Sequence, residues 1–133
     1  MSSNKIRLLI ARDSDVTQAI LRTKRFCEQL GFHVHVVTMI VTTVSELAHN
    51  IRKYAQMGEI QLRKVSSGFK TGIEVVAVDK GPGIPDINKA MQDHVSSGGT
   101  LGLGLPGVQR MMDEFEIKTE RQKGTEITVR KWM

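Results

Sequence analysis

The segment Gly72–Asp79 restricts the fold of this chain more than any other feature of its sequence. It is apolar at nearly every position and ends in an aspartate. A run this apolar, without the alternation of a strand at a wetted surface, is typical of a strand in the interior of a sheet. We therefore predict a sheet with this strand at its centre. The other strands are predicted at Lys5–Ala11, Glu59–Ser66, Phe115–Glu120 and Thr125–Lys131.

Helical periodicity follows the first predicted strand. Apolar residues recur at helical spacing as far as Leu30, Asp13 or Ser14 offers an N-cap, and Gly31 is a natural stop. Cys27 lies on this apolar stripe. We interpret it as a small buried side chain rather than a reactive thiol.

A second helix is predicted from about Val36 to Ala55. The stretch Ile40–Val44 is a poor intrinsic helix former, because β-branched side chains are restricted at χ1, so a strand is an alternative there. The 3.6-residue apolar pattern continues through Tyr54 and favours the helix.

The stretch Lys80–Gly104 is rich in Gly, Pro, Ser and Asp, so we predict a long loop that has room for a short helix near Asp86–Gln92. A loop of this length in a compact domain is usually functional or disordered. It leads into a helix predicted over Pro106–Phe115, with proline in its first turn. A turn at Gln122–Gly124 joins the last two strands.

The composition is that of one globular domain, and we expect residues 1–133 to form it. The chain is 40% hydrophobic, which is enough for a single core. The net charge of +5 comes from single and paired basic residues, which favours solvated faces over a nucleic-acid surface. No secretory signal and no membrane-length apolar run is present. We therefore expect a cytoplasmic protein without nucleic-acid or membrane partners.

Glu46 and Asn50 are the first candidate functional residues. They lie four apart on the second predicted helix, so they share a face at the edge of the apolar stripe and can look into a cleft. A carboxylate there can accept a proton from an attacking hydroxyl, and an amide oxygen suits Mg²⁺ that also holds phosphates. Taken alone, an ordinary solvated Glu and Asn are the simpler explanation. His49 projects away from the stripe, and we predict that it is exposed and not catalytic.

Asp79 and the loop after it form the second candidate group. A carboxylate fixed at a strand end can accept a hydrogen bond from an exocyclic amine such as adenine N6. Gly81 and Gly83 let a flat base approach the backbone. The alternative is a solvent-facing turn, which explains less well why so apolar a strand ends in an acid.

The third candidate is the glycine-rich stretch Ser96–Gly107, which leads into a helix N-terminus. Backbone N–H groups and the helix dipole there attract phosphate, although Ser96–Thr100 also reads as a mobile linker. The stretch matches the dinucleotide-binding pattern G-x-G-x-x-G, but a loop rather than a strand precedes it and too few residues follow it. We reject that interpretation, and no Walker A sequence is present.

In their order and spacing, these three groups together resemble the GHKL family of ATPases and kinases, and the resemblance covers nearly the whole chain. It implies the Bergerat fold: a mixed, mainly antiparallel sheet with helices on one face and a glycine-rich ATP lid. Within the family, the stretches Ser45–Asn50, Asp79–Asp86, Gly102–Arg110 and Met112–Phe115 are very similar to the RsbT branch of anti-sigma-factor-type serine/threonine kinases.

The resemblance implies a role for each candidate residue. Glu46 would be the general base, Asn50 would hold Mg²⁺, and Asp79 would bind adenine N6 with Thr125 nearby. Arg110 is a candidate for the γ-phosphate, although a surface role suits it better. The nucleotide-binding residues implied by the resemblance are Asn50, Asp79, Gly81, Gly83, Ile84, Gly102, Leu103, Gly104, Leu105 and Thr125.

The resemblance also implies ATP as the phosphate donor and a set of protein partners. RsbT-type kinases phosphorylate Ser or Thr on STAS-domain proteins of the RsbS and RsbR type in the stressosome. When released, they bind and activate a PP2C-type phosphatase similar to RsbU. The alternative is a nucleotide-dependent binding switch that docks to partners with little or no catalysis. A histidine kinase or a DNA-linked ATPase of the gyrase type would need further segments that this chain has no room for.

Overall fold

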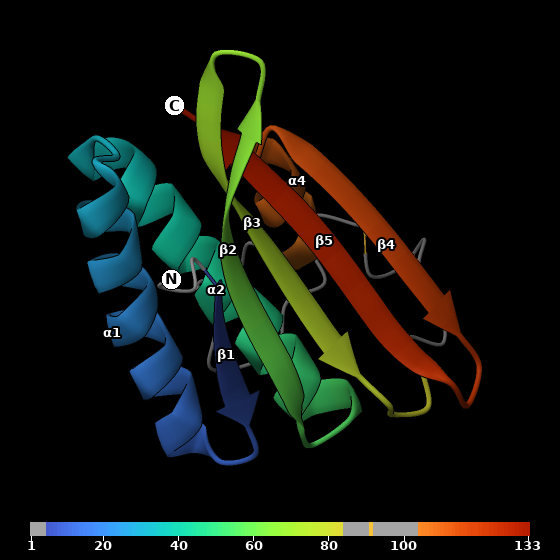
Figure 1. Cartoon of the computed structure of the whole chain (residues 1–133). Helices are drawn as coiled ribbons and strands as arrows, with labels where there is room; N and C mark the ends of the chain where they lie inside the picture. Colours follow the sequence, from blue (N-terminus) through green and yellow to red (C-terminus); the bar gives the residue numbers. More distant parts are fainter. Residues whose placement is uncertain (1–4, 84–90, 92–103) are drawn as a thin grey trace.

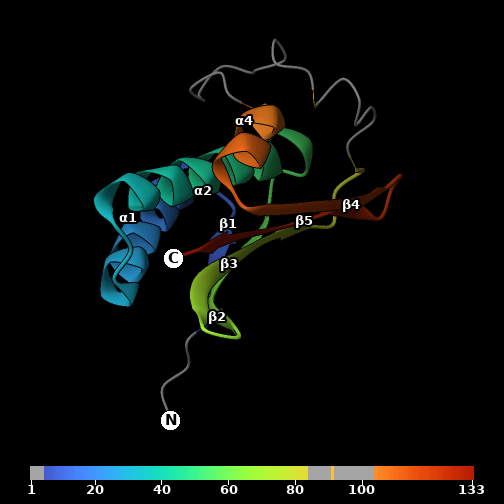
Figure 2. The same cartoon turned by 90° about the horizontal axis from the view of Figure 1, so that it is seen from above.

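The protein is described by a computed structural model that defines residues 5–83, 91 and 104–133. Figures 1 and 2 show two layers, with the sheet on one side and the helices together on the other. The predicted two-layer α/β sandwich is therefore confirmed. The elements in chain order are β1 (Lys5–Ile10), α1 (Asp13–Leu30), α2 (Val34–Tyr54), β2 (Gly58–Ser67), β3 (Lys70–Asp79), α4 (Gly104–Met111), β4 (Glu114–Glu120) and β5 (Gly124–Trp132).

The five-stranded sheet has the order β1-β2-β3-β5-β4, so β3 lies at its centre, as predicted. Each strand pairing among the described residues is antiparallel, and this part of the sheet is therefore not mixed. The register places Asp79, the last residue of β3, between Gly58 on β2 and Thr125 on β5.

Helix α2 packs on the sheet and supplies much of the core. Ile40, Val44 and Leu47 are fully buried against a sheet face that includes Ile73 and Val75. Burial of each such side chain stabilises the fold by about 1.5–3 kcal/mol, whereas a β-branched residue in a helix costs at most about 0.7 kcal/mol. The free energy gained by burial therefore exceeds the cost in helix propensity, and this stretch forms a helix rather than the alternative strand. No helix in the described ranges is long and apolar enough to cross a membrane.

The helix starts differ from the prediction. The N-cap of α1 is Arg12 rather than Asp13 or Ser14. The Asp15 carboxylate accepts hydrogen bonds from the backbone N–H groups of Ala11 and Arg12, both at 3.0 Å. Helix α2 begins at Val34 rather than Val36, because His33 Nδ1 accepts a hydrogen bond from a backbone N–H of the first turn. Polar side chains therefore fix both starts, where the apolar pattern carries no signal.

Cys27 is completely buried on α1, as interpreted from its place in the apolar stripe. Desolvation by burial, followed by the charge of Glu28, raises the pKa of its thiol to about 12. The thiolate form is therefore disfavoured, which supports a packing role.

The last predicted helix was placed wrongly at both ends. It spans Gly104–Met111 rather than Pro106–Phe115. The side chain of Asp113 accepts a hydrogen bond from the Trp132 backbone N–H at 2.7 Å, and Glu114 pairs with Arg130 across the sheet. These contacts with β5 draw the chain out of the helix and into β4.

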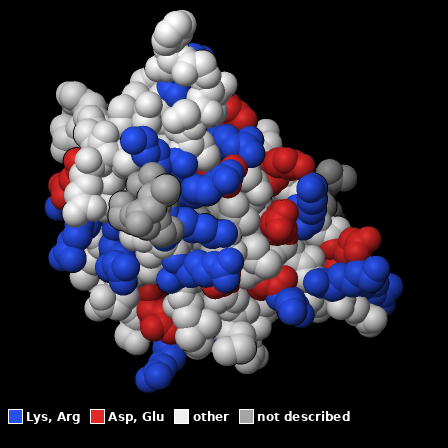
Figure 3. Space-filling view, in the orientation of Figure 1, with Lys and Arg blue, Asp and Glu red and all other residues white. Residues whose placement is uncertain are grey.

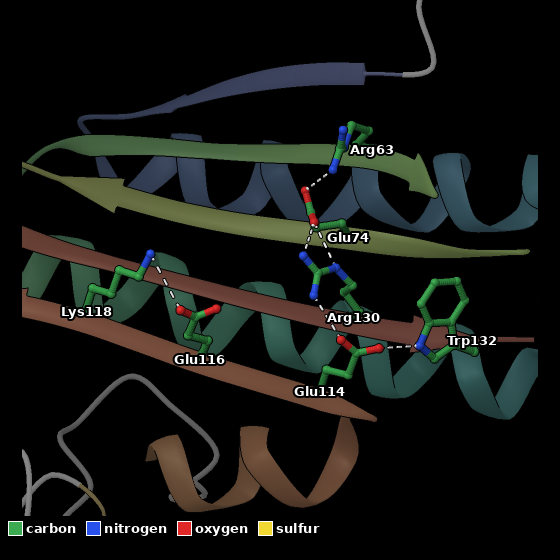
Figure 4. Close-up of polar contacts among 7 residues, drawn as sticks. All are labelled: Arg63, Glu74, Glu114, Glu116, Lys118, Arg130 and Trp132. Carbon is green, nitrogen blue, oxygen red and sulfur yellow. Dashed lines mark hydrogen bonds and ion pairs between the residues drawn. The ribbon is translucent and has the colours of Figure 1, made fainter. Parts of the chain in front are cut away.

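The sheet face opposite the helices carries a row of linked charged side chains (Figures 3 and 4). Glu74 on β3 is only 7% exposed, although none of the described helices covers this face. Its carboxylate pairs with Arg63 at 2.8 Å and with Arg130 at 2.8 Å. Arg130 also pairs with Glu114, and hydrogen bonds from Trp132 and then Arg130 lower the pKa of Glu114. The row joins four neighbouring strands through their side chains.

We predict that Glu74→Ala destabilises the protein, because it leaves two guanidinium groups without the carboxylate between them. The expected loss in the free energy of unfolding is about 1–3 kcal/mol. Glu116→Ala is the matched control, since its pair with Lys118 is long and well exposed, and we expect a change within about 0.5 kcal/mol. Urea unfolding of both variants measures the difference. Equal losses would contradict the structural role of Glu74.

Candidate nucleotide site

Helix α2 places Glu46 and Asn50 together at the edge of its buried face. Glu46 is only 2% exposed, which confirms that it belongs to a covered face rather than to solvent. Asn50 lies one turn further on, and its Nδ2 atom is buried without a hydrogen-bond partner in the described part of the chain. A buried amide without a hydrogen-bond partner costs free energy, unless a ligand supplies that partner. This position therefore suits a polar ligand.

His49 is half-buried rather than exposed as predicted. Its Nδ1 lies 2.7 Å from the carbonyl oxygen of Ser45, one turn earlier on α2. Since a carbonyl only accepts, Nδ1 carries the proton and donates it. The hydrogen bond draws the ring against its own helix, which the angular position of His49 alone does not reveal.

Asp79 ends β3 as a buried acid, 9% exposed. Its Oδ1 accepts a hydrogen bond from the Gly81 N–H at 3.0 Å, which fixes the carboxylate at the start of the loop. Its Oδ2 makes no hydrogen bond with the described residues. One carboxylate oxygen thus holds the turn, and the other is left to accept from a ligand.

Two threonine hydroxyl groups lie close together opposite Asp79, one on β5 and one on β4. Thr125 is 6% exposed, and its Oγ1 lies 2.9 Å from Oγ1 of Thr119 on β4. Thr119 in turn donates to the Gly124 carbonyl at 3.3 Å. With its proton engaged there, Thr119 accepts from Thr125, whose lone pairs are then free to accept from a ligand. Thr119 was missed in the sequence, although it continues the inward-facing alternation of Phe115 and Ile117.

A cavity of about 690 Å³ opens where β3 ends and β5 begins. Its lining includes Asp79, Thr119 and Thr125. The volume is in the range of small-molecule and cofactor sites. The acid and the hydroxyl pair therefore border a space that can hold part of a nucleotide.

The glycines around this cavity are required by close backbone contacts. A Cβ at Gly81 would lie 2.5 Å from the Ala55 Cβ, and one at Gly83 would lie 2.6 Å from the Glu120 carbonyl oxygen. Gly124 has a φ of +106°, and a Cβ there would lie 2.0 Å from the Asp79 carbonyl oxygen. Packing within the chain thus already requires glycine at these positions, whatever space they also give to a base.

The third candidate group is the glycine-rich stretch Ser96–Gly107, and the structure describes only its last residues, from Gly104 on. Gly104 begins α4, with a φ of +59°, and Leu105 is buried. Pro106 lies in the first turn, as predicted, and α4 packs against α2 (Figure 2). Arg110 is exposed in the last turn. Ile84, Gly102 and Leu103 lie outside the described residues, as does nearly all of the short helix expected near Asp86–Gln92.

The site combines three features: an acid at the end of the central strand, a polar pair on the covering helix, and a glycine that leads into a further helix. Together they define a GHKL-type ATP-binding domain. The histidine kinase-like ATPase domain family matches residues 9–131. The chain therefore belongs to this family, within its RsbT-type branch of serine/threonine-protein kinases, and membership implies that it uses ATP.

The assignment to the RsbT-type branch rests on similar proteins that match most of this chain. The chain is 43% identical to the serine/threonine-protein kinase RsbT of Bacillus subtilis, over 93% of each protein. It is 35% identical to an anti-sigma F factor of Thermoanaerobacter, over 81% of this chain and 78% of that protein.

Solved structures share the fold at low sequence identity. The SiaB–SiaC complex of Pseudomonas aeruginosa matches with a TM-score of 0.57 at 11% identity, over 97% of this chain and 89% of the other. The mycobacterial sensor histidine kinase MprB matches with a TM-score of 0.54 at 17% identity, over 98% and 97% of the two chains. These likenesses support the fold alone.

We predict that Gly124→Ala lowers both stability and nucleotide affinity. The new methyl group would meet the Asp79 carbonyl at a backbone conformation that alanine rarely adopts, and β5 would have to shift away from Asp79. We expect at least about 1–3 kcal/mol of destabilisation and weaker binding of a fluorescent ATP analogue. Gly68→Ala is the control, because its φ is also positive but nothing lies near it. Unchanged nucleotide affinity in a folded Gly124→Ala protein would separate this glycine from the site.

Proposed function

We propose that this chain transfers the γ-phosphate of ATP to a serine or threonine of a STAS-domain protein of the RsbS or RsbR type. The observation that carries the proposal is the presence, one turn apart on α2, of a buried carboxylate, Glu46, and of Asn50, whose Nδ2 is buried without a hydrogen-bond partner among the described residues. The sequence similarity to RsbT supports the choice of a protein hydroxyl as acceptor.

Glu46 acts as the general base in this proposal. It accepts the proton of the hydroxyl as the oxygen forms a bond to the γ-phosphorus, while the bond to the bridging oxygen of ADP breaks. A carboxylate almost excluded from water is held in place by the helix, and needs no reorganisation when the hydroxyl arrives.

Asp79 selects the base. Its free carboxylate oxygen accepts from an exocyclic amine, and the Thr125 hydroxyl beside it is positioned by Thr119. Gly81 and Gly83 shape the loop along the base, together with Ile84. The glycine stretch with Gly102, Leu103, Gly104 and Leu105 leads its backbone N–H groups to the phosphates, where a helix N-terminus favours negative charge.

Asn50 is the proposed protein ligand for Mg²⁺. An amide presents a donor on one side and an acceptor on the other, and its oxygen is a ligand type that Mg²⁺ accepts. Mg²⁺ would neutralise charge on the phosphates during transfer. Within the described residues, no group of three or more His, Cys, Asp or Glu could hold a metal ion. The proposed site therefore depends on Asn50 and the phosphates.

Partner switching completes the proposal. After release from its STAS-domain substrates in the stressosome, the chain would bind and activate a PP2C-type phosphatase similar to RsbU. These partners would place the kinase in the cytoplasm. Similarity to anti-sigma F factors favours one second candidate, a nucleotide-dependent binding switch with little catalysis. Retention of nucleotide without turnover in the presence of a partner would distinguish it.

Replacing Glu46 tests the proposed base. We predict that Glu46→Ala lowers the rate of transfer to a STAS-domain protein by about 10²–10⁴-fold, while ATP still binds. Radiometric transfer assays and nucleotide titration measure the two effects separately. Glu116→Ala, on the opposite face of the sheet, should retain the parent rate. A Glu46→Ala protein that phosphorylates its partner at the parent rate would show that another group removes the proton.

Replacing Asn50 tests the magnesium ligand. Asn50→Ala should reduce the gain in ATP affinity that Mg²⁺ gives to the parent, because the metal loses its protein ligand. Titrations of ATP with and without Mg²⁺ in both proteins measure that gain. An equal gain in both would remove Asn50 from the metal site.

Replacing Asp79 tests base recognition. Asp79→Asn should reduce the preference for ATP over GTP, because an amide can donate to guanine O6 whereas a carboxylate repels it. Competition between the two nucleotides gives the ratio of affinities, and the exposed Asp13→Asn serves as the matched control. A ratio that is the same in parent and Asp79→Asn would contradict the assignment.

A further inference from the structure

The outer face of α2 lacks the charges that a solvent-facing helix normally carries. From Val34 to Asn50 the only Asp, Glu, Lys or Arg is Glu46, and that side chain is buried. Val34 is 65% exposed and Met39 is 37% exposed. Helices that face water usually alternate an apolar stripe with charged residues. A helix face that is poor in charge and exposes apolar side chains and Met is typical of a protein interface.

The neighbouring helix shows the contrast. Helix α1 lies beside α2 in the same layer (Figure 1) and is equally open to solvent on its outer side. Its exposed positions include Arg22, Lys24, Arg25 and Glu28. The absence of charge is therefore a property of the Val34–Asn50 part of α2, and not of the whole helical layer.

A groove runs along this uncharged face between the two helices. It is a cavity of about 410 Å³ with Val34, Val37 and Val41 of α2 and Phe32 among its lining residues. Lys24 and Glu28 line it from α1. The α2 residues in the groove follow a helical stripe that includes Thr38 and Thr42, so the α2 side of the groove is uncharged, whereas Lys24 and Glu28 charge the α1 side.

The core accounts for only part of this stripe: Val37 is buried in it and Val41 packs against it, but Thr38 and Thr42 are not among its residues. Ile40 and Val44 face the sheet, and their burial explains them. Thr38 is exposed and Thr42 is only half-buried, although threonine is a weaker helix former than Ala, Leu or Glu. These two positions give up helix propensity without burial in the core, which is consistent with a contact to a partner.

The stripe leads to the proposed catalytic base. Thr42 and Glu46 are one turn apart, about 6 Å along the helix axis, and Met39 lies two turns before Glu46 on the same side. A standard protein interface covers about 800 Å² on each partner, a patch about 30 Å across. A protein seated on the groove would therefore also cover the region of Glu46.

We propose that the charge-poor face of α2 and the groove beside α1 form the docking surface for the protein that carries the phosphoacceptor hydroxyl. This rests on the proposed kinase function. The occupant is a STAS-domain protein that presents an apolar, uncharged segment to the groove and carboxylates to α1. Lys24 and Arg25 are exposed there and make no ion pair within the described ranges, so they can pair with those carboxylates.

The test adds charge to this face without touching the nucleotide site. Thr38→Arg places a guanidinium at an exposed position of the groove stripe, and Lys24→Glu removes the basic group of the α1 wall and adds an acid beside Glu28. Gln18→Arg is the matched control, because it adds the same charge at an exposed position of α1 that does not line the groove. Binding of a purified RsbS-type STAS-domain protein is measured by calorimetry, transfer by a radiometric assay, and nucleotide affinity by titration.

We expect Thr38→Arg and Lys24→Glu each to weaken binding of the STAS-domain protein at least tenfold and to raise its KM. The rate at saturating partner, the nucleotide affinity and the behaviour of Gln18→Arg should stay within twofold of the parent. Partner binding within twofold of the parent in both groove variants would overturn the proposal. So would a parent dimer that Thr38→Arg dissociates, because a second copy would then occupy the groove.

The outcomes separate this inference from the kinase function. A parent that binds the STAS-domain protein without transferring phosphate contradicts the kinase function, while the binding comparison still decides the docking surface. Phosphate transfer by the parent and by all three variants with the same KM for the STAS-domain protein supports the kinase function and overturns the docking surface.

Discussion

The packing of α2 on the central strand β3 is the contact on which the rest of the structure depends. One side of α2 is buried against Ile73 and Val75, and this fixes the rotation of the helix about its axis. Once that rotation is set, Glu46 and Asn50 lie together at the edge of the buried face of α2. The same rotation turns the uncharged side of α2 outward. Core packing, the proposed catalytic site and the proposed docking surface are therefore three consequences of one helix orientation.

The central strand contributes the second half of the site in a similar way. Its buried residues bring Asp79 to the end of the sheet, between β2 and β5, and the Gly81 N–H holds one oxygen of the carboxylate there. Gly124 allows β5 to begin directly against the Asp79 backbone, so that Thr125 and Thr119 complete the pocket. The row of charges around Glu74 ties four strands together on the opposite face. In the proposed site, base recognition would therefore depend on backbone contacts as much as on the acid itself.

Periodicity in the sequence predicted the elements that bury apolar side chains, because burial leaves a regular pattern. It found the central strand, the α2 helix and the buried Cys27, and it placed Glu46 beside the core. It failed where polar side chains decide. The Arg12 cap with Asp15, the early start of α2 at His33, and the end of α4 set by Asp113 all depend on hydrogen bonds to distant or flanking backbone, which leave no period. The half-buried His49 was missed for the same reason. Thr119 is different, because it continues the inward-facing alternation of β4 and was missed although the pattern includes it.

The central claim is that Glu46, on this helix, directs phosphate from ATP to a protein hydroxyl. The most direct test incubates the chain with γ-labelled ATP and an RsbS-type STAS-domain protein and maps the labelled residue. The account predicts label on a serine or threonine of the partner, and its loss with Glu46→Ala. Release of free phosphate with no label on the partner would contradict it.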